Sequence, residues 1–274
     1  MFGTVPPFFQ HLLDYAPFSE AVSKLWSGKS ISVDGVHGGA CALAAVAIRQ
    51  NGNRPILILT AAAEQAEQIT DDLELFLPAV PTLLFPALEH RTLVHETENN
   101  IFALADDLFG QRIQVLKQLL ESFCSQMIIV VPILSLLQQV PSKELLTERT
   151  QILQVGNQID PVRLRQFLIE SGYHNTPAVD LPGEFAVRGS IFDLFAPDWK
   201  QPVRVEFFDE EIESIRRFDL VTQRSLENVN KIDLTRLLPD EAIGASLLDY
   251  LPPASPIILV EPREIQLEAQ RLYG

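Results

Sequence analysis

The chain has 274 residues, of which 47% are hydrophobic and 21% charged, and its 21 basic and 36 acidic side chains give a net charge of -15. This composition is too apolar for a disordered segment, and at roughly 150 residues per domain the length indicates about two domains. Nucleic acid binding by the chain as a whole is not expected, because the excess of negative charge repels phosphate groups.

The two cysteines, Cys41 and Cys124, form no metal-ligand motif. Each lies in an apolar, helix-like context, so we expect reduced, buried thiols in a cytoplasmic protein, without a disulfide or a zinc site. The longest apolar run, 127–137, is interrupted by Pro132. It is much shorter than the roughly 20 residues that a membrane helix needs.

Short β-branched segments alternate with longer helical segments in the first half of the chain. This alternation predicts a parallel sheet covered by helices, with ligands beyond the carboxyl ends of the strands. The expected strands are 31–34, 55–60, 82–85 and 127–133, and the expected helices are 40–50, 61–77 and 98–123.

From about Leu145 the pattern changes to strands with period-two alternation and hairpin turns. We expect a strand at 152–155, a helix at 161–171 ended by Gly172, and strands at 185–195, 203–208 and 212–218. A strand expected at 256–260 and a helix expected at 263–273 then repeat the strand and helix alternation of the first half. The sequence therefore predicts a discontinuous α/β domain, residues 1–143 and 237–274, with a small α+β domain of residues 144–236 inserted.

A glycine-rich turn with Gly35, Gly38 and Gly39 follows the first expected strand. A phosphate-binding loop would continue with a glycine, a lysine and a hydroxyl residue, which hold the phosphates and magnesium. Here Ala40, Cys41 and Ala42 occupy those positions. We interpret the turn as a degenerate nucleotide loop that is kept for close packing of strand and helix.

The segment that would supply the acidic residues of an ATPase is altered as well. Such an enzyme needs an apolar strand that ends in two carboxylates, one for magnesium and one to activate water. The apolar run 257–260 is followed by Glu261 and Pro262, and proline cannot accept a proton. We therefore expect no catalytic residues, no enzymatic activity and no cofactor.

Other candidate sites are weaker. His90 and His95 lie among glutamates, but their spacing does not place both imidazoles on one helix face, as a metal-binding pair requires. A polar surface loop explains them, and we expect no metal site. The chain also lacks the G-x-S-x-G motif of a hydrolase.

The most distinctive stretch runs from Gly183 to Phe195 and continues from Pro202 to Arg216. Together with 218–226, it strongly resembles the small domain that the bacterial excision-repair protein UvrB shares with the transcription-repair coupling factors (Mfd). The matching motifs are long and without gaps, so they are specific. The resemblance covers essentially the whole chain and is strongest over 183–238.

The degenerate loop distinguishes between these two relatives. UvrB has a working phosphate loop and a tyrosine-rich hairpin that clamps DNA, whereas the segment 84–90, where such a hairpin would begin, contains no tyrosine. The chain instead resembles the amino-terminal UvrB-homology module of the coupling factors. That resemblance implies a degenerate RecA-like (P-loop NTPase-type) fold, and it implies that the chain is a fragment or a truncated product of a longer protein.

The resemblance also implies a function: recruitment of UvrA, the damage-recognition ATPase, through the small domain in transcription-coupled nucleotide excision repair. The contact positions of the family correspond to Arg188, Arg204 and Phe208. RNA polymerase and DNA would be bound only through other parts of such a protein.

Strand periodicity supports two of these positions independently. Within 203–208, period two places Arg204 and Phe208 on the face opposite the three apolar residues Val203, Val205 and Phe207. An exposed aromatic residue beside an arginine is typical of a protein interface.

Two alternative functions stay open. A UvrB-like excinuclease subunit would carry lysine and serine or threonine at positions 41 and 42. An unrelated α/β enzyme would bind a small ligand in the loop after Asp34.

Overall fold

The computed structural model describes residues 14–50, 52–88, 99–121, 127–236 and 244–273. The chain divides into two compact units. The first comprises residues 1–87, 115–139 and 246–274, and the second comprises residues 88–114 and 140–245. The domain limits expected at 144 and 236 stay predictions.

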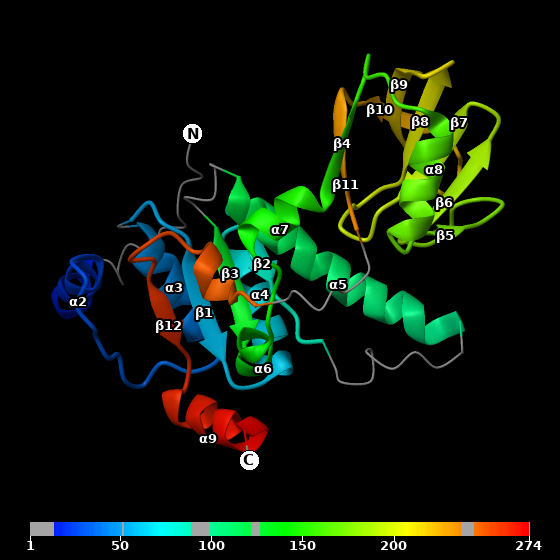
Figure 1. The fold of residues 1–274 in the computed structure, drawn as a ribbon. Helices are drawn as coiled ribbons and strands as arrows, with labels where there is room; N and C mark the ends of the chain where they lie inside the picture. The colour runs from blue at the N-terminus through cyan, green and yellow to red at the C-terminus, as the bar shows by residue number, and fades with distance from the viewer. Residues whose placement is uncertain (1–13, 51, 89–98, 122–126, 237–243, 274) are drawn as a thin grey trace. The chain divides into compact units, whose positions relative to one another are not determined.

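A four-stranded parallel sheet forms the centre of the first unit, in the order β12-β1-β3-β2 (Figure 1). Every residue of β1 and β3 is buried, as continuous apolar runs require when both faces of a strand are covered. The strands are β1 (Ile56–Thr60), β2 (Thr82–Leu84), β3 (Ile128–Pro132) and β12 (Ile257–Leu259). The predicted parallel sheet is confirmed, whereas its RecA-like character stays a prediction.

Helices α3 and α4 contribute to one hydrophobic core with this sheet. Helix α2 joins the same core through Phe18 and Val22, and the Trp26 indole donates a hydrogen bond to the carbonyl of Ile48 at 2.8 Å. The helices are α2 (Ala16–Trp26), α3 (Gly39–Gln50), α4 (Ala63–Phe76), α6 (Ile133–Leu137), α9 (Pro262–Tyr273) and the 3-10 helix η3 (Leu247–Tyr250). Helix α5 (Asn99–Leu120) has residues in both units.

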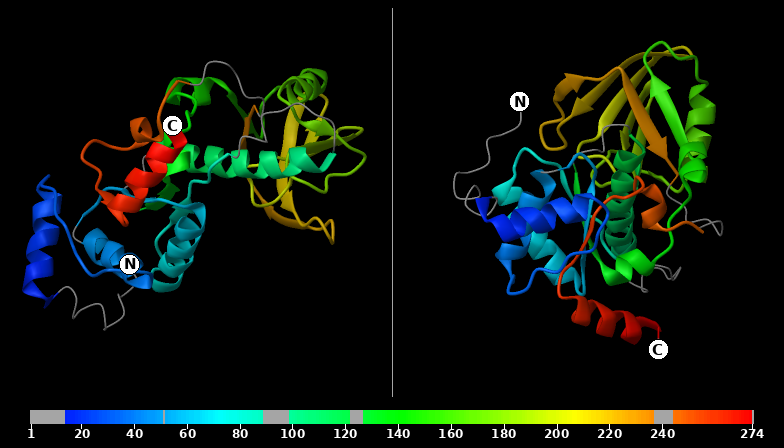
Figure 2. Two further views of the ribbon diagram at one scale, coloured as in Figure 1. Left: turned by 90° about the horizontal axis from the view of Figure 1, so that it is seen from below. Right: turned by 90° about the vertical axis from the view of Figure 1, so that its left-hand side faces the viewer.

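The strand expected at 31–34 does not form. This segment runs past β12 without joining the sheet, as Figure 2 shows, and β12 is left as an edge strand. The sequence explains the difference, because Ile31 and Val33 alternate with serines, whereas β1 and β3 are apolar at nearly every position. An alternating segment can bury only one face, so it gains less by entering a parallel sheet.

A six-stranded sheet in the order β10-β9-β8-β7-β6-β5 forms the centre of the second unit. Helix α8 (Pro161–Glu170) covers one face, where Leu164 and Leu168 pack into a core with sheet residues. Asp160 caps this helix by accepting a hydrogen bond from the Val162 amide at 2.8 Å. The expected helix is thus confirmed, as is its end at Gly172, which has a φ of 89°.

All neighbouring strands of this sheet are antiparallel except β5 and β6. The strands are β5 (His174–Asn175), β6 (Glu184–Arg188), β7 (Ile191–Phe195), β8 (Val203–Phe208), β9 (Glu211–Phe218) and β10 (Ser225–Asn228). The unit also contains helix α7 (Lys143–Glu148) and an antiparallel ribbon of β4 (Thr150–Gln154) and β11 (Lys231–Thr235).

The prediction of one strand over 185–195 is wrong. The segment forms two strands, β6 and β7, joined at Gly189 and Ser190. Gly189 has a φ of 62°, a conformation that favours glycine and that tight two-residue hairpins require. The Gly-Ser pair between two apolar runs is therefore the signal that marks this turn.

We expect Gly110→Ala to destabilise the chain. Gly110 lies in α5 against the backbone of Pro197, and a Cβ at this position would collide with that backbone. Alanine favours a helix over glycine by about 1 kcal/mol, but overpacking costs about 2 kcal/mol, so the thermal midpoint should fall. Gly244→Ala is the control, because a Cβ there meets no atom within 4 Å. An unchanged or raised midpoint for Gly110→Ala would contradict this packing.

Candidate protein-binding face

The alternation predicted in β8 is confirmed. Its inner side chains, Val203, Val205 and Phe207, are buried in the core beneath α8. Arg204 and Phe208 point to the opposite face, and Phe208 is 70% exposed. We call this side of the six-stranded sheet the outer face.

Strand register determines which other side chains share the outer face. Residues that are directly paired across antiparallel strands point to the same side of a sheet. Asp193 pairs with Arg204, and Arg204 pairs with Arg216 on the next strand. A second row of paired residues consists of Arg188, Ile191, Glu206 and Ser214.

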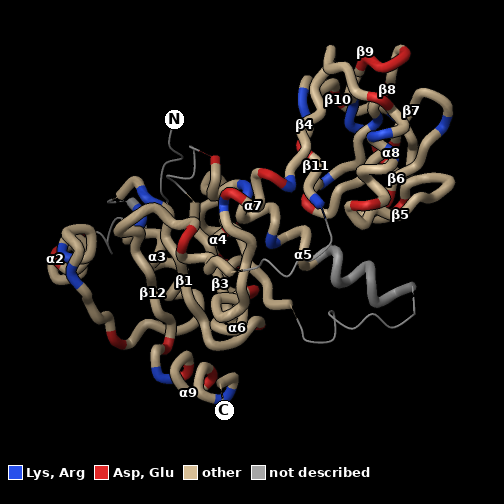
Figure 3. Tube along the Cα trace, viewed as in Figure 1, with Lys and Arg blue, Asp and Glu red and all other residues tan. Residues whose placement is uncertain are grey.

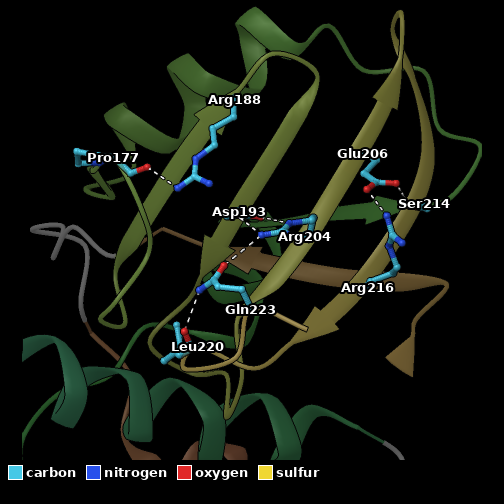
Figure 4. Close-up of polar contacts among 9 residues, drawn as sticks. All are labelled: Pro177, Arg188, Asp193, Arg204, Glu206, Ser214, Arg216, Leu220 and Gln223. Atoms are coloured by element: carbon cyan, nitrogen blue, oxygen red, sulfur yellow. Dashed lines mark hydrogen bonds and ion pairs between the residues drawn. The ribbon is translucent and has the colours of Figure 1, made fainter. Parts of the chain in front are cut away.

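Arg188 lies at the exposed end of β6. Its Nη2 donates a hydrogen bond to the carbonyl oxygen of Pro177 at 3.0 Å (Figure 4). That acceptor is neutral, and Arg188 makes no ion pair within the described part of the chain. Its positive charge is therefore available to an acidic group of a partner.

Arg204 is in a different environment. Its Nε and Nη2 donate to the two carboxylate oxygens of Asp193 at 2.6 and 2.9 Å, and its guanidinium lies 4.7 Å from the centre of the Phe218 ring. The Arg204 side chain is only 21% exposed, and its hydrogen bonds to the Asp193 carboxylate raise its pKa. The predicted face is correct, but the guanidinium is already engaged by a carboxylate.

Glu206 forms a second polar group on this face. Its carboxylate accepts a hydrogen bond from the Ser214 hydroxyl at 2.9 Å and forms an ion pair with Arg216 (Figure 4). Sequence reasoning missed this group, and it missed Asp193. The alternation of charged and apolar residues in β7, β8 and β9 was the available signal. It predicts which side chains share a face, but it does not predict the register between strands that brings Asp193 opposite Arg204.

One end of the outer face is covered by loops. Val179 and Leu220, from two different loops, pack with Ala186 and Phe195 in a small cluster. The opposite end, with Arg188 and the strongly exposed Phe208, is left open to solvent.

The glycine-rich loop that we interpreted as a degenerate nucleotide loop lies in the first unit, just before α3. Gly35 and Gly38 have positive φ values of 77° and 54°. The loop borders a cavity of about 670 Å³ between segments 28–37 and 254–262. Nδ1 of His37 lies 3.6 Å from Oε1 of Glu261, so the glycine-rich loop and the segment after β12 meet in the structure.

The positions that would hold phosphate and metal carry no suitable groups. The Ala42 side chain is fully buried, and Gly39 begins the helix. Cys41 is half-buried, and burial together with the charge of Glu261 raises the pKa of its thiol. Cys124 lies outside the described residues.

The described residues contain no group of three or more His, Cys, Asp or Glu that could hold a metal ion. His90 and His95 lie outside that part of the chain. The same described part contains no helix with the length and apolar character needed to cross a membrane.

We expect no binding of Mg-ATP. The cavity beside the loop is lined by one lysine, Lys29, and two carboxylates, Asp34 and Glu261, so it offers little attraction to phosphates. Isothermal titration with Mg-ATP should give no heat of binding. A dissociation constant in the micromolar range would overturn the interpretation of the loop as degenerate.

Comparison with known proteins gives a family match within the second unit. Residues 152–238 match the family model of the UvrB interaction domain. The chain is 32% identical over 219 residues to the transcription-repair-coupling factor of Bacillus subtilis strain 168, a match that covers 79% of this chain and 18% of that protein. It is 32% identical over 183 residues to the protein of the same name from Staphylococcus aureus strain bovine RF122 / ET3-1, which covers 67% of this chain and 15% of that protein.

These matches confirm the resemblance inferred from the sequence. Residues 152–238 match the UvrB interaction domain, and the chain is similar to transcription-repair-coupling factors over most of its length. It spans less than a fifth of the length of those relatives.

Proposed function

We propose, on the premise that residues 152–238 form a UvrB interaction domain, that the chain recruits UvrA to stalled transcription complexes and has no catalytic activity of its own. Such a domain fits a role in transcription-coupled DNA repair and implies a partner of the UvrA type. The observation that carries the proposal is the open end of the outer face, where Arg188, which forms no ion pair with any described residue, and the exposed Phe208 lie on one sheet.

Phe208 provides apolar area for binding. An aromatic side chain that is 70% exposed loses its contact with water when a partner covers it, and the burial of its ring is favourable. The neighbouring inner residue, Phe207, is only 4% exposed and belongs to the core. Phe208 therefore lies outside this core, and its ring is accessible to a partner.

Arg188 provides charge. Its guanidinium has donors beyond the one that binds Pro177, so it can form a charge-assisted hydrogen bond with a carboxylate of the partner. Arg204 offers less charge, since Asp193 neutralises it. The face thus combines one uncompensated cation with one aromatic residue, the side-chain types that dominate interface energetics.

The absence of catalysis is inferred from the first unit. Neither the loop at 35–42 nor the segment at 261–262 contributes the lysine, the hydroxyl or the second carboxylate that ATP hydrolysis requires. Contacts with RNA polymerase and DNA would then belong to parts of a longer protein outside this chain.

Substitution of Arg188 or Phe208 by alanine should weaken UvrA binding by about thirtyfold each. Both side chains are exposed, so the free energy of unfolding should change by about 0.5 kcal/mol or less. Affinity for purified UvrA and the thermal midpoint are the two measurements. Arg165→Ala and Val162→Ala are matched controls, because both residues are exposed on α8, which covers the opposite face of the sheet.

These controls should bind like the unsubstituted chain. Wild-type affinity for both Arg188→Ala and Phe208→Ala would show that UvrA does not use the outer face. If an alanine variant unfolds and loses binding for that reason, the result contradicts the proposal that the substituted side chain is an exposed contact residue.

We expect weak or undetectable DNA binding at physiological salt. Figure 3 shows basic and acidic residues interspersed along the described parts of the chain. With a net charge of -15, contacts to phosphates would be opposed by repulsion. Gel shift with duplex and bubble DNA is the measurement, and tight binding that falls steeply with added salt would contradict this expectation.

A further inference from the structure

The arginines of the outer face differ in how their charges are compensated. Arg204 is paired with Asp193, and Arg216 is paired with Glu206 (Figure 4). Arg188 instead donates to the neutral carbonyl of Pro177. Arg188 and Arg204 therefore cannot contribute to a docking surface in the same way.

Asp193 is the more buried member of its ion pair. Its side chain is 5% exposed, against 21% for Arg204, and the two residues face each other directly in the register of β7 and β8. A buried ion pair is weak evidence for stability, because apolar residues of similar volume often stabilise a protein as well or better. The orientation that Asp193 gives to the Arg204 side chain explains the presence of the pair better than a gain in stability does.

The geometry of the pair fixes the orientation of the guanidinium plane. The two hydrogen bonds that Arg204 donates to Asp193 determine the orientation of the guanidinium, and the centre of the Phe218 ring lies 4.7 Å from it on one side. Gln223 accepts a third, longer hydrogen bond from Nη2 at 3.4 Å. An arginine held in this way loses less rotamer freedom when a partner binds, so a larger share of the contact energy appears as affinity.

We propose that Asp193 is a positioning residue that holds Arg204 in the orientation required for docking, while Arg188 supplies the uncompensated charge. This inference rests on the proposed recruitment of UvrA. It adds a residue that does not itself need to touch the partner, since its carboxylate is buried beneath Arg204.

A double-mutant cycle tests the inference. UvrA affinity is measured for the full chain and for Asp193→Asn, Arg204→Ala and the double variant. Asp193→Asn keeps the size of the side chain but removes its charge, so it should weaken binding by roughly tenfold in the unsubstituted background and by less than about twofold when Arg204 is already alanine. Glu170→Gln, an exposed carboxylate on α8, is the control and should bind normally.

A purely structural role for Asp193 predicts a different pattern. The thermal midpoint would then fall, and the loss of affinity would be the same in both backgrounds. Equal losses, or wild-type affinity for Asp193→Asn, would overturn the inference. If the unsubstituted chain itself fails to bind UvrA, the proposed function fails instead.

Arg204→Lys provides a second test that does not depend on the folding of Asp193→Asn. Lysine keeps the positive charge and can still pair with Asp193, but it lacks the planar fork. We expect this variant to bind UvrA about tenfold more weakly than the unsubstituted chain. Wild-type affinity would show that charge alone is needed and would overturn the positioning role.

Discussion

Burial of the inner side of β8 beneath α8 determines which face of the small domain can meet a partner. Val203, Val205 and Phe207 are all in the core, so the residues between them must point outward. A register slip of one residue would expose the apolar set and bury Arg204, at a large cost in free energy. The position of Phe208 on the outer face thus follows from packing on the inner face and needs no separate explanation.

The parts of this structure that the sequence predicts are those encoded within one segment. The parallel strands β1 and β3, helix α8 with its Asp160 cap, and the alternation of β8 all follow from local periodicity. The pairing of Asp193 with Arg204 depends on the register between two strands, which a single strand does not reveal. The strand predicted at 31–34 does not form for another reason. Whether a segment joins a sheet depends on how well its two faces pack against the rest of the protein, and local periodicity does not determine that packing.

The two units place their polar groups in contrasting ways. In the first unit, Glu261 lies just after β12, at the end of a parallel strand, where an α/β protein ordinarily binds small ligands. His37 lies beside it, and the cavity that both residues line has little to hold an anion. In the second unit, two ion pairs lie on one face of a sheet, at residues that are paired across neighbouring strands. The exposed end of that face carries Arg188 and Phe208, side chains of the kinds that protein interfaces favour.

The open edge of β12 has a practical consequence for work with the isolated chain. Ile257 and Leu259 are 44% and 49% exposed, and among the strands that the structure describes, β12 pairs with β1 alone. Unpaired strand edges with apolar side chains can pair with the edges of other molecules. At high protein concentration, self-association through this edge would mimic or mask specific binding. Affinity measurements are therefore best made in dilute solution, with light scattering to verify that the chain stays monodisperse.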